Sequence, residues 1–106
     1  MRYKVLFTGD PGITQKGTLG DTAALLTSYC TVDTTKEIIG VLITVETNPV
    51  RFAFNDTAPT QAGVGHILTA GQSIKLTNTT QVESMRVINH TNGSNAVLQI
   101  TLEYNI

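Results

Sequence analysis

The chain has 106 residues and a formal net charge of −1, and its length is typical of one small globular domain. Apolar residues make up 41% of the chain, a share that excludes an intrinsically disordered chain. Only 14% are charged, and the seven Lys and Arg are scattered, so we expect no nucleic-acid partner. The single cysteine, Cys30, excludes an internal disulfide. The apolar run in the first residues is too short for a signal peptide, and no stretch approaches transmembrane length. We therefore expect synthesis in a cytoplasm and no membrane partner.

Threonine supplies much of the polar surface, with eighteen residues. Two explanations remain open at this point. A neutral, hydroxyl-rich surface loses its water at lower cost than a charged one, which favours contact with neighbouring proteins. Threonine is also a β-branched residue that is common in strands, whatever the strands contact.

The first third of the chain gives mixed signals. Tyr3, Val5 and Phe7 alternate with Arg2, Lys4 and Leu6, which predicts an opening strand. Residues 8–20 contain four glycines and a turn signal at 10–12, so we predict a long N-terminal loop or extended arm that orders against a neighbour. Residues 22–27 fit either a strand or one helical turn, and the β-rich composition that follows favours the strand.

The centre of the chain predicts two clear strands. Residues 38–45 are apolar on both faces, which indicates a central strand covered on both sides. Residues 50–54 alternate, with Phe52 and Phe54 predicted to point inward. Residues 55–65 are rich in Asp, Thr, Pro and Gly and predict a loop.

The last third predicts short strands separated by turns. Strands are expected at 66–68, 73–77 and 85–89, with turns at 70–71 and 78–80 and a hairpin loop at 91–95. The final strand alternates most cleanly, with residues 96, 98, 100, 102 and 104 inward and 97, 99, 101 and 103 outward. Seven or eight short strands predict an all-β fold, an antiparallel two-sheet, jelly-roll-like sandwich in which residues 1–106 form one domain.

No catalytic or metal-binding pattern stands out. His66 and His90 have no second ligand at metal spacing, and the carboxylates form no paired signature. Residues 33–35 and 55–57 offer oxygen ligands for calcium, although such tripeptides are more typical of Asx-turns. We therefore predict a protein that is not an enzyme and has no cofactor and no metal.

One half of the chain resembles a known group of proteins. The pattern is carried by residues 51–54, 57–60, 65–74, 85–88 and 96–104. It is similar to the small β-sandwich structural proteins of tailed bacteriophages, which include capsid decoration (cement) proteins and some neck or tail components. The resemblance implies a virion protein on the capsid exterior, with the major capsid protein or other virion subunits as partners. It also implies a homo-oligomer, with a trimer favoured. That group of proteins has no catalytic residues to assign to positions in this chain.

From the resemblance and the loop pattern we expect a protein that cements the capsid by bridging adjacent capsid subunits. The alternatives are a neck, tail or baseplate component of the same virion and, from another class, a carbohydrate-binding module of a fibre. The expected protein-contact residues come from the two long loops: Pro11, Gly12, Ile13, Asn55, Asp56, Thr57, Pro59 and Thr60.

Overall fold

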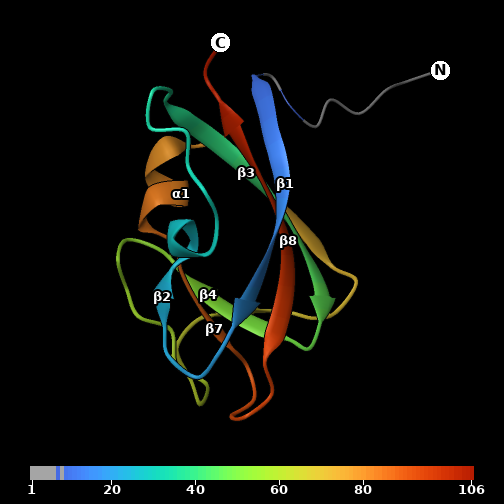
Figure 1. The fold of residues 1–106 in the computed structure, drawn as a ribbon. Helices are drawn as coiled ribbons and strands as arrows, with labels where there is room; N and C mark the ends of the chain where they lie inside the picture. Colours follow the sequence, from blue (N-terminus) through green and yellow to red (C-terminus); the bar gives the residue numbers. More distant parts are fainter. Residues whose placement is uncertain (1–6, 8) are drawn as a thin grey trace, which may run out of the picture.

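Two four-stranded antiparallel sheets pack face to face in the computed structural model, which describes residue 7 and residues 9–106 (Figure 1). Sheet A has the strand order β1 (Asp10–Leu19), β8 (Ala96–Tyr104), β3 (Ile38–Thr47) and β6 (Ser73–Leu76). Sheet B has the order β2 (Ala24–Leu25), β7 (Arg86–Asn89), β4 (Val50–Ala53) and β5 (His66–Leu68). The predicted all-β, two-sheet antiparallel sandwich is confirmed.

The chain passes from one sheet to the other at every connection except the one between β4 and β5, which pair with each other. The first and last strands are neighbours in sheet A, with Asp10 opposite Tyr104 and Leu19 opposite Ala96. This strand order is that of an eight-stranded jelly roll. Strand β1 lies at the edge of sheet A, so only one of its two sides pairs with another strand of the sheet.

The core lies between the sheets and is filled by the inward faces of β8 and β3. Leu98, Ile100 and Leu102 are at most 1% exposed, as the predicted alternation along the last strand requires. Strand β3 is a central strand, flanked by β8 and β6, as predicted. The face of β3 that points away from the core is only partly covered, as the half-buried side chains of Leu42 and Thr44 on that face show.

The prediction of a loop or arm over residues 8–20 is wrong for residues 10–19, which form β1. The glycines serve close packing here. A Cβ on Gly17 would lie 3.1 Å from Tyr29 Cβ, so a side chain there would require the segment that flanks the strand to shift by a few tenths of an ångström. Gly12 and Ile13 together face the single residue Leu102, which makes a β-bulge and replaces the turn expected at 10–12. The strand predicted from Tyr3 and Val5 lies outside the described residues.

Two short helices interrupt the sandwich. Residues 22–27, which fit either a strand or a helical turn, contain both: β2 is followed directly by the 3-10 helix η1 (Leu26–Tyr29). The turn expected at 78–80 is instead the start of helix α1 (Thr79–Ser84), because Asn78 accepts a hydrogen bond from the Gln81 amide at 3.1 Å and caps the helix. The predicted loop over residues 55–65 is confirmed. Residues 91–95 also form a loop, but the prediction of a hairpin there is wrong, because the loop joins β7 of sheet B to β8 of sheet A and these strands do not pair.

Candidate functional site

A groove of about 290 Å³ opens along the first half of β1, between this edge strand and the segment 31–36 that follows η1. We call it the β1 groove. Its walls and floor come from three parts of the chain that are far apart in sequence: Asp10, Pro11, Gly12, Ile13 and Gln15 of β1; Thr31, Val32, Asp33 and Lys36; and Leu102 and Tyr104 of β8. The groove therefore brings together the predicted contact residues Pro11, Gly12 and Ile13.

The floor of the β1 groove is apolar and rigid. Leu102 and Tyr104 are 1% and 6% exposed, and both belong to the core. A Cβ on Gly12 would lie 2.9 Å from Tyr104 Cε2, so only glycine lets β1 approach the ring this closely. The bulge turns the neighbouring Ile13 outward, and this side chain is 73% exposed at the rim. Buried and exposed apolar groups thus lie side by side at an edge strand.

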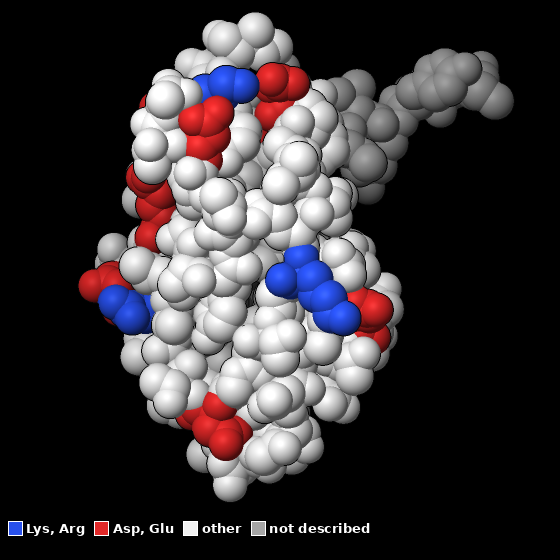
Figure 2. Space-filling model, viewed as in Figure 1, with Lys and Arg blue, Asp and Glu red and all other residues white. Residues whose placement is uncertain are grey.

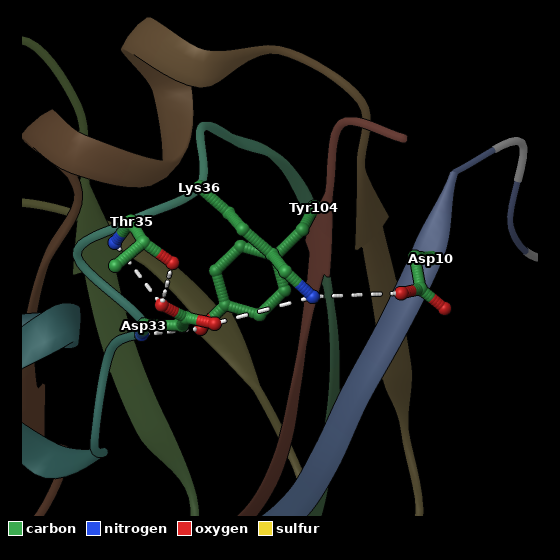
Figure 3. A network of polar contacts seen from close by, with 5 residues as sticks. All are labelled: Asp10, Asp33, Thr35, Lys36 and Tyr104. Atoms are coloured by element: carbon green, nitrogen blue, oxygen red, sulfur yellow. Dashed lines mark hydrogen bonds and ion pairs between the residues drawn. The ribbon is translucent and has the colours of Figure 1, made fainter.

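The opposite wall of the groove is held by hydrogen bonds to Tyr104 and within the segment 33–36 (Figure 3). The Asp33 amide donates to the Tyr104 hydroxyl at 2.9 Å. Asp33 Oδ1 accepts from the Thr35 amide at 3.0 Å and from the Thr35 hydroxyl at 2.6 Å. These bonds confirm the Asx-turn interpretation of residues 33–35, and they fix the Asp33 carboxylate at the rim.

Lys36 lies between two carboxylates at this rim, as Figure 3 shows. Its Nζ is 3.8 Å from Asp10 Oδ2 and 4.0 Å from Asp33 Oδ2, and it is 5.9 Å from the centre of the Tyr104 ring. Hydrogen bonds from Thr35 hold the pKa of Asp33 below its ordinary value, and the positive charge of Lys36 acts in the same direction. The Asp33 carboxylate is therefore charged at neutral pH. Two aspartates and one lysine give the rim a formal net charge of −1.

Gln15 closes the groove at its far end. Its side-chain amide donates to the Thr31 carbonyl at 2.9 Å, and its side-chain oxygen accepts from the Thr31 amide at 2.7 Å. The side chain thus makes the two hydrogen bonds that a neighbouring strand would make with Thr31. Beyond Gln15, Gly17 lies against Tyr29, and the groove follows only the first half of β1.

The other predicted contact residues, Asn55, Asp56, Thr57, Pro59 and Thr60, do not line the groove. They lie on the loop between β4 and β5, which is bonded to its own domain. Asp56 Oδ1 pairs with Arg86 Nη2 at 2.7 Å, and Pro59 is buried. The Thr60 hydroxyl accepts from the amides of Gly63 and Val64. Contact with a partner through this loop stays a prediction.

The groove residues Asp33, Lys36 and Tyr104 were not identified as contact residues from the sequence. The tripeptide 33–35 did carry a local signal, since it was recognised as a turn. Its place beside β1 depends on the pairing of β1 with β8, which joins residues about 90 positions apart, such as Asp10 and Tyr104. No local pattern carries that information.

A second polar cluster joins three connections at the other end of β1. Asp21 Oδ1 accepts hydrogen bonds from Asn89 Nδ2 at 2.7 Å, from the Gly93 amide at 2.8 Å and from Gln61 Nε2 at 3.1 Å. These bonds lower the pKa of Asp21, the bond from Asn89 most of all. Asn89 is 0% exposed and is one of the few buried polar residues of the sandwich. We call this cluster the Asp21 clasp.

Charged groups form small separate spots on the face drawn in Figure 2, where Lys and Arg lie among Asp and Glu and large areas carry no charge.

Within residues 7 and 9–106, no group of three His, Cys, Asp or Glu side chains is placed to hold a metal ion. No helix in the same residues has the length and apolar character needed to span a membrane. The rings of Phe52 and Tyr104 are buried, at 5% and 6% exposure.

No known protein family and no curated protein matches the sequence. Among solved structures, a chain from a study of the disulfide-linked pili that form Bacillus endospore appendages aligns with 100% of this chain and 97% of its own length. The two are 14% identical, and the TM-score is 0.46. The similarity is too distant to carry an argument about function.

Proposed function

We propose that this chain is a non-enzymatic structural subunit of a tailed-bacteriophage particle and that it binds neighbouring subunits through β1 and the β1 groove. The observation that carries the proposal is the combination of an edge strand with a 73% exposed Ile13 and an adjoining groove with an apolar floor. Exposed apolar groups beside an open sheet edge favour association with another chain.

The assignment to a virus particle rests on the resemblance of residues 51–104 to phage structural proteins. Within the particle we favour the capsid exterior, where the chain would bridge adjacent subunits of the major capsid protein. The low charge of the surface supports contact with other proteins, because uncharged polar groups lose their water at lower cost than charged ones. Many copies on one particle would add weak individual contacts into firm attachment.

The test is quantitative mass spectrometry of density-purified phage particles from the source of the gene. We expect the chain in the particles at hundreds of copies, at a fixed ratio to the major capsid protein. Six or twelve copies per particle would overturn capsid decoration and support the neck, tail or baseplate alternative. Absence of the chain from the particles would overturn the virion proposal altogether.

A further inference from the structure

The geometry points to a second copy of this chain as a partner of the β1 groove, with the N-terminal residues 1–6 of that copy as the segment that occupies it. This inference rests on the proposed function, since it names a partner for the same surface. It follows from three observations: which way the chain enters β1, what the groove walls offer, and the residue pattern of the segment.

The chain enters β1 from the face of sheet A that points away from the groove. The Gly9 amide donates to Glu103 Oε2 at 2.5 Å, and the Phe7 ring lies 5.1 Å from Lys75 Nζ. Glu103 lies between the inward-facing Leu102 and Tyr104, so its side chain points to the outer face. The groove floor consists of those two inward-facing residues. Phe7 and Gly9 are therefore held across the sheet from their own groove, which favours a different copy as the donor of the occupant.

The pattern of residues 1–6 matches the groove in both polarity and charge. Tyr3 and Val5 alternate with Arg2 and Lys4, so in an extended segment these two apolar side chains share one face, and the two cations share the other face with Leu6. The groove offers Ile13, Leu102 and Tyr104 to the apolar face. Its volume of about 290 Å³ corresponds to roughly ten water molecules in the liquid, which is enough room for apolar side chains of this size.

The rim carboxylates are able to receive the cations of the segment. Lys36 Nζ lies 3.8 Å from Asp10 and 4.0 Å from Asp33, which is longer than the about 2.7–2.9 Å of a charge-assisted hydrogen bond. Asp10 and Asp33 therefore keep oxygens available despite Lys36. The rim has a net charge of −1, whereas Arg2 and Lys4 carry two positive charges. The attraction supports one orientation, in which the cations face the rim and the apolar side chains face the floor.

Such a contact is head-to-tail, because the donated segment and the receiving groove are different surfaces of the chain. Contacts of this type build either a closed ring, such as a trimer, or an open chain. They also allow a complementation experiment on full-length protein. Arg2→Glu/Lys4→Glu inactivates the segment and keeps the groove, whereas Asp10→Lys inactivates the groove and keeps the segment. Glu46→Lys is the matched control, since Glu46 lies near the opposite end of sheet A and is exposed.

Sedimentation velocity over a concentration series measures the assemblies. We expect wild type and Glu46→Lys to form assemblies of two or more copies, and each of the other two variants alone to stay monomeric. An equimolar mixture of these two variants should form dimers and nothing larger, because it contains one intact segment and one intact groove per pair. Wild type that stays monomeric, or a mixture that forms no dimer, would overturn the inference.

A peptide experiment covers the case in which a variant folds poorly. The receptor is the full-length Arg2→Glu/Lys4→Glu chain, whose groove is intact, and the probe is a fluorescent peptide of residues 1–8. Fluorescence anisotropy should show saturable binding, weakened on the order of tenfold when the peptide carries Glu at positions 2 and 4. Equal binding of both peptides, or none, would overturn the inference. These outcomes are separate from the presence of the chain in virus particles, which tests the proposed function alone.

Discussion

Lys75 Nζ lies 2.6 Å from Glu103 Oε1, and the Glu103 side chain is only 2% exposed although it points away from the core. The ion pair joins β6 to β8 across β3, where Gly40 leaves room for it: a Cβ there would lie 2.7 Å from Glu103 Oε1. A buried carboxylate is tolerated only where charges and hydrogen bonds replace its water. The pair and the Gly9 amide together fix the place where the chain enters β1.

We expect Lys75→Met to lower the free energy of unfolding by about 3 kcal/mol, because it removes the cation that lies 2.6 Å from the buried Glu103 carboxylate. The double variant Lys75→Met/Glu103→Met should recover at least half of the loss, since it removes both charges. Urea denaturation of the three proteins measures the effect. A loss of under about 1 kcal/mol in the single variant would show that the pair contributes little.

Gly12→Ala should destabilise the protein by about 1–3 kcal/mol, because the new Cβ would lie 2.9 Å from Tyr104 Cε2 and force the ring or the bulge to shift. Gly63→Ala is the matched control. A Cβ at Gly63 meets nothing within 4 Å, so its effect should stay within about 0.5 kcal/mol. Urea midpoints of the two variants give the comparison, and equal midpoints would contradict the close approach of β1 to Tyr104.

Asp21→Asn should make the free energy of unfolding fall less steeply in acid. Hydrogen bonds lower the pKa of Asp21 in the folded protein below its ordinary value of 3.8. The contribution of the carboxylate is therefore complete above the unfolded pKa and is lost as the pH falls through the lower, folded value. Urea denaturation from pH 7 down to pH 2 should show a steeper decline below pH 4 for wild type than for the variant. Parallel declines would contradict the role of the Asp21 clasp.

The thiol of Cys30 should react slowly in the folded protein. Burial raises the pKa of Cys30 and so lowers the fraction of the reactive thiolate. We expect a disulfide reagent at pH 8 to modify the folded chain at least about tenfold more slowly than the chain unfolded in urea. Equal rates would mean that the thiol is accessible in the native state.

The sequence predicts the fold best where burial is regular. In β8, core residues such as Leu98 and Ile100 alternate with outward ones, so the strand and its inward face can be assigned without a structure. The exposure of the outward-facing positions is predicted less reliably than the burial of the inward-facing ones. Glu103 occupies an outward position, but it is buried because the Lys75 side chain and the chain entering β1 cover it.

Strand β1 shows why the candidate site could not be derived in full. Pro11, Gly12 and Gly17 are typical of loops, and local pattern alone therefore favours an arm. The two glycines serve long-range packing instead, since a Cβ on Gly12 would lie 2.9 Å from Tyr104 Cε2 and a Cβ on Gly17 would lie 3.1 Å from Tyr29 Cβ. Pro11, Gly12 and Ile13 line the groove together with residues of β8 and of the segment 31–36, and contact with a partner through them stays a prediction.

The position of β8 has a consequence for how the protein is made. This strand lies between β1 and β3, so the two longest earlier strands of sheet A cannot be joined until residues 96–104 are available. On the ribosome those residues emerge after the strands from β1 to β7. Until then β1 and β3 would have no partner along the edges that pair with β8 in the folded sheet. Synthesis of β8, rather than of any earlier segment, would set the moment at which sheet A closes.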